Sequence, residues 1–123
     1  MEFLVNIDLW ERAYIDLWSI PHFFFGFLSF YLLLKINLKK SSSFIIVIIF
    51  AILWEFIEYF TPVQEYVTNI ITDVVLAGVG FLFAGFIKII KPNKGSLIIK
   101  ISTFIFVISG LLGYTASFIR NFL

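Results

Sequence analysis

The chain has 123 residues, of which 61% are hydrophobic and 20% are aromatic, and its mean hydropathy is +1.04. Soluble domains are about 45 to 50% apolar, and the apolar runs of this chain have no polar face. The net charge of +1 and the absence of cysteine give no sign of nucleic-acid binding and exclude disulfides and thiol chemistry. The composition therefore predicts a single-domain, all-α integral membrane protein.

The first seventeen residues mix charged and apolar side chains. Phe3, Ile7, Trp10, Tyr14 and Leu17 recur at helical spacing, which indicates one apolar stripe. The charged residues between them make this segment a poor membrane span. We therefore expect residues 1–17 to form an amphipathic helix that lies in the membrane interface.

Four apolar runs follow, each close to the length of about 20 residues that crosses a bilayer. We expect transmembrane helices over roughly residues 19–37, 44–60, 68–90 and 96–119. The first and third connections are polar turns rich in lysine, and the second begins with Thr61 and Pro62. The predicted fold is thus one four-helix transmembrane domain preceded by an interfacial helix.

The distribution of cationic residues predicts the orientation of this domain. Lysines surround the first and third turns, whereas the opposite side has only Arg12 and Arg120. Because cytoplasmic loops carry the excess of Lys and Arg, both lysine-rich turns should face the cytoplasm. Both termini should then face outward, and the protein should be a multi-pass protein of the cell membrane. The lysines are Lys35, Lys39, Lys40, Lys88, Lys91, Lys94 and Lys100.

This topology gathers ionisable residues from all four helices at the outer end of the domain: His22, Glu55, Glu58, Asp73 and Arg120. Ionisable side chains in membrane helices are costly and commonly functional. We expect His22, Glu55 and Asp73 to be the catalytic candidates. Glu58 and Arg120 are the candidate binding residues.

Three of these residues, and Glu65 in the second link, also have a simpler interpretation. Glu58 and Glu65 could be carboxylates at the level of the lipid headgroups, and Glu65 is expected only at the rim of the site. His22 could be an interfacial histidine with satisfied hydrogen bonds, and Arg120 could be an anchor that reaches the headgroups.

Small residues line one face of the third predicted helix and one face of the fourth, and each face carries a charged residue at one end. Such faces let helix backbones approach closely. We therefore expect both charged residues, Asp73 and Arg120, to point into the bundle. The two faces consist of Asp73, Ala77, Gly80 and Ala84, and of Ser102, Ser109, Gly113, Ala116 and Arg120.

The pattern of polar residues resembles the VanZ-like superfamily, including its YjdF-like relatives, over roughly residues 18–90. The residues that carry the resemblance are Pro21 and His22, the run Trp54–Glu58, Thr61 and Pro62, and the run Thr72–Gly78. The family often has Gln at the position of Glu58 and an Arg in the second link, where this chain has no Arg or Lys. The resemblance implies a link to glycopeptide resistance but no defined reaction.

The sequence leaves three functions open. The first is an outward-facing pocket that binds or modifies the headgroup of a lipid or of a cell-envelope precursor, with His22, Glu55 and Asp73 as acid–base groups. The second is a non-catalytic scaffold or accessory protein held together by a buried polar network. The third is a small proton-coupled exporter, which the one-sided placement of the carboxylates disfavours.

The cofactor is unknown, and a divalent metal is the one that these residue types would suit. His22, Glu55 and Asp73 are the candidate ligands for Mg²⁺, Mn²⁺ or Zn²⁺, although no HExxH or cysteine signature accompanies them. Membrane lipids are the expected partners, and nucleic acid is not. A homo-oligomer and a membrane-protein partner both stay open, as does whether the protein is an enzyme.

Overall fold

The computed structural model describes residues 6–61, 63 and 65–122. Within them the chain is helical and contains no strand. The elements in chain order are η2 (Ile7–Leu9), α1 (Ser19–Lys35), α2 (Lys40–Glu58), α3 (Val67–Ile90), η3 (Pro92–Lys94) and α4 (Gly95–Phe122). The four α-helices lie where the sequence predicted apolar spans.

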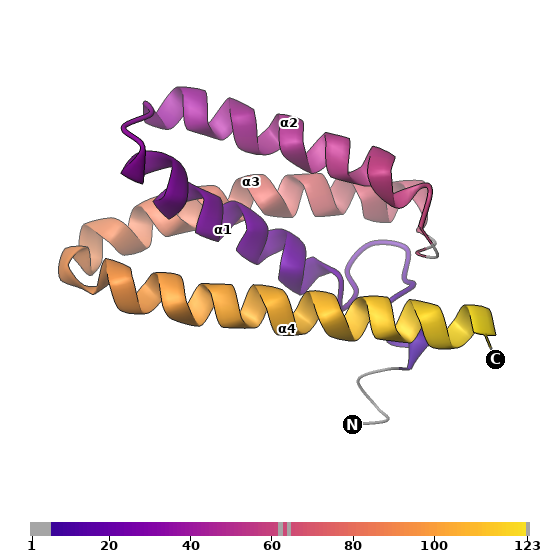
Figure 1. The fold of residues 1–123 in the computed structure, drawn as a ribbon. Coiled ribbons are helices and arrows are strands. Elements are labelled where there is room, and N and C mark those ends of the chain that lie inside the picture. The colour runs from indigo at the N-terminus through magenta and orange to yellow at the C-terminus, as the bar shows by residue number, and fades with distance from the viewer. Residues whose placement is uncertain (1–5, 62, 64, 123) are drawn as a thin grey trace.

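Three of these helices, α2, α3 and α4, are long and apolar enough to cross a membrane. The remaining helix, α1, has 17 residues and is therefore only about 26 Å long. Figure 1 shows α1 between α2 and α4, with α3 behind it. It packs against all three of the other helices and most extensively against α3, so α1 is the central helix of the bundle.

Small residues allow the close approach of α1 and α3. A Cβ added to Gly26 would overlap the carbonyl oxygen of Ala77, and a Cβ added to Gly80 would overlap that of Phe23. Ala77, Gly80 and Ala84 are all buried, which confirms that the small face of α3 is a packing face.

The connections between helices sort to the two ends of the bundle (Figure 1). The α1–α2 and α3–α4 turns lie together at one end, and the α2–α3 link lies at the other with residues 6–18 and the end of α4. All the lysines of the two turns are thus separated from the carboxylates at the end of α2. Pro62, part of the predicted link, lies outside the described residues.

The prediction of an amphipathic helix over residues 1–17 is wrong for the part that the structure describes. Residues 6–18 form the short η2 turn and then a loop across the end of the bundle, and we call this segment the N-terminal cap. The helical stripe fails because Trp10 is 2% exposed whereas Tyr14 is 63% exposed. Trp10 instead packs edge-on against buried Trp18, with ring centroids 5.1 Å apart.

The N-terminal cap is fastened to α3 and α4 at the same end of the bundle. The side-chain amide of Asn69 on α3 donates to the Tyr14 carbonyl at 2.6 Å and to Oδ2 of Asp16 at 3.0 Å. Glu11 forms an ion pair with Arg120 near the end of α4. These contacts need a folded-back chain, and a straight helix in the membrane interface could not make them.

Candidate functional site

Three helices bring a histidine and two carboxylates together beneath the N-terminal cap. His22 lies in the first turn of α1, Glu55 in the last turn of α2 and Asp73 in the second turn of α3. Nε2 of His22 is 3.3 Å from Oδ2 of Asp73 and 3.7 Å from Oε1 of Glu55. The structure thus assembles all three of the candidate catalytic residues in one place.

These side chains are withdrawn from solvent. His22 is 6% exposed and Asp73 is 0% exposed. Neither carboxylate oxygen of Asp73, nor Oε1 of Glu55, has a hydrogen-bond partner in the described part of the chain. A buried carboxylate without partners is strongly destabilised, so this site requires a counter-charge or a proton.

Glu65, in the link between α2 and α3, joins this group, although it was expected only at the rim. One ligand atom from each of His22, Glu55, Glu65 and Asp73 lies within 4.8 Å of the others. We call these four residues the carboxylate–histidine cluster. Glu65 lies outside the helices, so helical spacing could not predict where its side chain points. The one sequence signal for Glu65 was its position between two helix ends that carry carboxylates.

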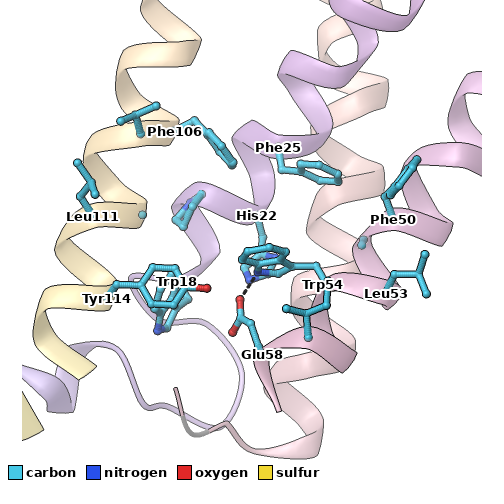
Figure 2. A pocket seen from close by; sticks show the side chains of 15 residues that line it. Trp18, His22, Phe25, Phe50, Leu53, Trp54, Glu58, Phe106, Leu111 and Tyr114 are labelled. Carbon is cyan, nitrogen blue, oxygen red and sulfur yellow. Dashed lines mark hydrogen bonds between the residues drawn. The ribbon is translucent and has the colours of Figure 1, made fainter. Parts of the chain in front are cut away.

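Glu58 lies next to the cluster, one helical turn beyond Glu55. Its side chain is buried, and its Oε1 accepts a hydrogen bond from Nε1 of Trp54 (Figure 2). Its second oxygen, Oε2, has no hydrogen-bond partner among the described residues. Glu58 therefore presents an acceptor oxygen at the edge of the site, as a binding residue would.

Arg120, the other candidate binding residue, forms its ion pair with Glu11 of the N-terminal cap. The sequence missed the role of Glu11 because an interfacial helix would have kept this residue away from α4. The observed pair holds the cap in place over the site.

Asp16 of the N-terminal cap adds a further buried carboxyl group near the cluster. Burial raises its pKa from 3.8 to about 6, and the negative charge of Glu65 acts in the same direction. Backbone N–H groups, that of Arg12 first among them, oppose this increase of the pKa. Asp16 is therefore a group whose charge changes near the lower end of the physiological pH range.

A cavity of about 500 Å³ opens beside the cluster, between α1, α2 and α4. Figure 2 shows His22 and Glu58 at its polar end and apolar side chains of all three helices around the rest, Phe25, Leu53 and Leu111 among them. The cavity exists because α2 and α4 flank α1 with few contacts to each other.

The cavity extends from the polar end along the side of the bundle. On α2 its lining runs from Glu58 to Phe50, a distance of about 12 Å at the helical rise. On α4 it runs from Tyr114 to Phe106. The cavity thus runs along the lateral face of the bundle, away from its polar end.

Comparison of the chain with protein-family models, with curated proteins and with solved structures found no match. The VanZ-like resemblance and the link to glycopeptide resistance that it implies therefore stay predictions from the sequence.

Proposed function

We propose that this protein binds an amphipathic lipid in the membrane, with a hydrocarbon chain in the lateral cavity and the headgroup at the carboxylate–histidine cluster and Glu58. One observation carries this proposal. The apolar cavity and the buried polar cluster meet at His22, which belongs to the cluster and also lines the cavity. The site therefore has the same division into polar and apolar parts as a lipid.

The position of the cavity favours a lipid over a water-soluble ligand. The flanking helices α2 and α4 are both long and apolar enough to cross a membrane. A lateral opening between such helices gives onto the hydrocarbon of the bilayer. The volume of about 500 Å³ lies within the range of ligand sites. Apart from His22 and Glu58, the lining has few polar groups that could bind a polar ligand.

The proposed arrangement in the cell follows from the lysines. We place four spans in the cell membrane, with α1 as the short central span and with the lysine-rich turns in the cytoplasm. The cluster then lies near the outer surface, where headgroups of lipids and lipid-linked envelope precursors are found. The link to glycopeptide resistance that the VanZ-like resemblance implies is compatible with this setting.

Modification of the headgroup would add proton transfer to binding. Nε2 of His22 faces carboxylate oxygens of both Glu55 and Asp73. As long as Nε2 binds no other ligand, an imidazole oriented in this way is suited to accept or donate a proton at a bound headgroup. Binding is the part of the proposal that can be tested first.

The test is lipid retention by the purified protein, measured by native mass spectrometry after incubation with phosphatidylethanolamine and phosphatidylglycerol. Gly110 lines the cavity, and a Cβ added to it would meet no atom within 4 Å. Gly110→Leu should therefore fill the cavity without a clash and reduce the amount of retained lipid. The matched control is Val75→Leu on the exposed face of α3, which should retain lipid as the wild type does. Equal retention by both variants would contradict the proposal.

A second candidate function is that of a scaffold, and the contacts of His22 favour it. This residue links α1 to carboxylates on both α2 and α3, so the cluster could serve only to hold the helices together. In that case substitution of the cluster would unfold the protein, whereas a ligand site would tolerate it. The first prediction in the Discussion separates these functions.

A further inference from the structure

The carboxylate–histidine cluster has more acceptors than the protein satisfies. Asp73 is completely buried, and neither of its oxygens has a hydrogen-bond partner among the described residues. Both carboxylate oxygens of Glu65 are also buried, and they lie beside the carboxyl groups of Glu55 and Glu58. The acceptor atoms of these side chains lie close together. A cation bound between them would offset the electrostatic cost of burying several carboxylates.

We propose that His22, Glu55, Glu65 and Asp73 bind one divalent metal ion. Ligand atoms at about 2.1 Å from a single ion lie roughly 3 to 4 Å from one another. The His22–Asp73 and His22–Glu55 pairs already meet this condition at 3.3 Å and 3.7 Å. All four ligand atoms lie within 4.8 Å, so small side-chain movements close the coordination sphere.

The four ligands come from α1, α2, the α2–α3 link and α3, which makes the site a product of the whole fold. His22 is itself more than nine-tenths buried and turns its Nε2 toward two of the carboxylates. This geometry distinguishes the site from a chance group of surface acids, in which side chains point apart into water. A metal site also explains the position of Glu65, which belongs to no helix and does not line the cavity.

The ligand set selects the kind of metal. One imidazole nitrogen with three carboxylates suits Mn²⁺ or Zn²⁺. Mg²⁺ is less suited, because it gives up its waters reluctantly and prefers oxygen ligands. Ca²⁺ needs six to eight oxygens in most sites, more than this mixed cluster supplies.

A metal at this position also specifies the headgroup, a step that rests on the proposed function. Carboxylates alone would repel the phosphate of a lipid and attract an amine. A bound divalent ion reverses this preference, since a phosphate oxygen can complete its coordination. The metal form should therefore hold an anionic phospholipid at the polar end of the cavity.

The metal site is tested on the purified full-length protein by elemental analysis and by titration with Mn²⁺, Zn²⁺ and Mg²⁺ after removal of metal with EDTA. We expect one Mn²⁺ or Zn²⁺ per chain, tighter than Mg²⁺, with an increased melting temperature on binding. Glu65→Gln should weaken binding at least about 10-fold, because a ligand is lost, and should leave the fold of the metal-free protein unchanged. The control Asp8→Asn removes one negative charge from an exposed position on the cap and should bind metal as the wild type does.

Two results would overturn the metal site: no binding of Mn²⁺ or Zn²⁺, or equal weakening in Glu65→Gln and Asp8→Asn. Tighter binding of Mg²⁺ would overturn the assignment of the metal class. A second arm measures retention of phosphatidylglycerol by the metal-loaded and the EDTA-treated protein. Retention that survives EDTA would refute the metal–headgroup contact and leave lipid binding intact. Metal binding without any lipid retention would refute the proposed function and leave the metal site intact.

Discussion

Nε2 of His22 lies 3.3 Å from Oδ2 of Asp73, and both side chains are buried at one end of the helical bundle. The contact joins the start of α1 to α3 at the point where an apolar cavity begins. Buried groups of this kind either stabilise a fold or hold a ligand, and the two roles predict different behaviour for the same substitutions.

Asp73→Asn and Glu55→Gln should fold and insert into the membrane but lose metal and lipid binding. The substitutions keep the shape of each side chain and remove a carboxylate in which both oxygens of Asp73, or Oε1 of Glu55, have no hydrogen-bond partner among the described residues. Removing such a group relieves an electrostatic cost, so the melting temperature of the metal-free protein should stay the same or rise. The measurement is thermal unfolding in detergent beside the binding assays. Early melting of both variants would favour the scaffold function.

Gly26→Ala should destabilise the bundle by about 1 to 3 kcal/mol, because its Cβ would overlap the Ala77 carbonyl oxygen and force α1 away from α3. Gly110→Ala is the control, since nothing lies within 4 Å of a Cβ at that position. Alanine is favoured over glycine in a helix interior by roughly 0.5 to 1 kcal/mol, so the control should be slightly stabilised. Equilibrium unfolding in mixed detergent micelles measures both. A similar effect of the two substitutions would show that the α1–α3 contact does not limit stability.

Asp16 should make the stability depend on pH. Its pKa is about 6 in the folded protein and 3.8 without the fold, so between these values the folded state binds more protons than the unfolded state. The contribution of Asp16 to stability is then complete below pH 3.8 and is lost as the pH rises through about 6. After allowance for solvent screening the loss is worth about 1 to 2 kcal/mol.

The comparison with Asp16→Asn isolates this effect, because all other groups titrate in both proteins. The wild type should lose stability relative to the variant as the pH is raised from about 4 to 7. Thermal unfolding over this pH range gives the difference. A constant difference would show that Asp16 has the same pKa in both states.

Single-cysteine labelling should place the cluster on the outer side of the membrane. The natural chain has no cysteine, so Ser42→Cys and Tyr66→Cys each introduce one reactive thiol. Both positions are exposed, at opposite ends of the bundle. A membrane-impermeant reagent should label Tyr66→Cys in intact cells and Ser42→Cys only after permeabilisation. The reverse pattern would invert the proposed orientation and put the site at the cytoplasmic surface.

The helices and their packing faces could be predicted from the sequence because both depend on local patterns. A long apolar run must satisfy its own backbone hydrogen bonds, and this requirement favours a helix wherever such a run occurs. The small face of α3 likewise follows from spacing, and Ala77 and Ala84 are buried as that spacing predicts. With antiparallel order, the same rules bring His22, Glu55 and Asp73 to one end.

The remaining features depended on contacts that no local pattern specifies. Residues 6–18 have helical spacing, yet the burial of Trp10 and Trp18 against the bundle and the hydrogen bonds of Asn69 hold them in an irregular cap. Arg120 pairs with Glu11 because the N-terminal cap folds back over α4. Glu65 reaches the cluster because of the path that the α2–α3 link follows. The cavity arises only because α2 and α4 both pack on α1 without filling the space between them.

The sequence by itself thus determined that four apolar helices form and that His22, Glu55 and Asp73 gather at one end, since periodicity and hydropathy act over neighbouring residues. Tertiary structure alone decided that a link residue completes the carboxylate–histidine cluster and that an apolar cavity begins at the histidine of this cluster. Those outcomes depend on how segments distant in the chain meet, and the free energy of such contacts is set by packing in three dimensions.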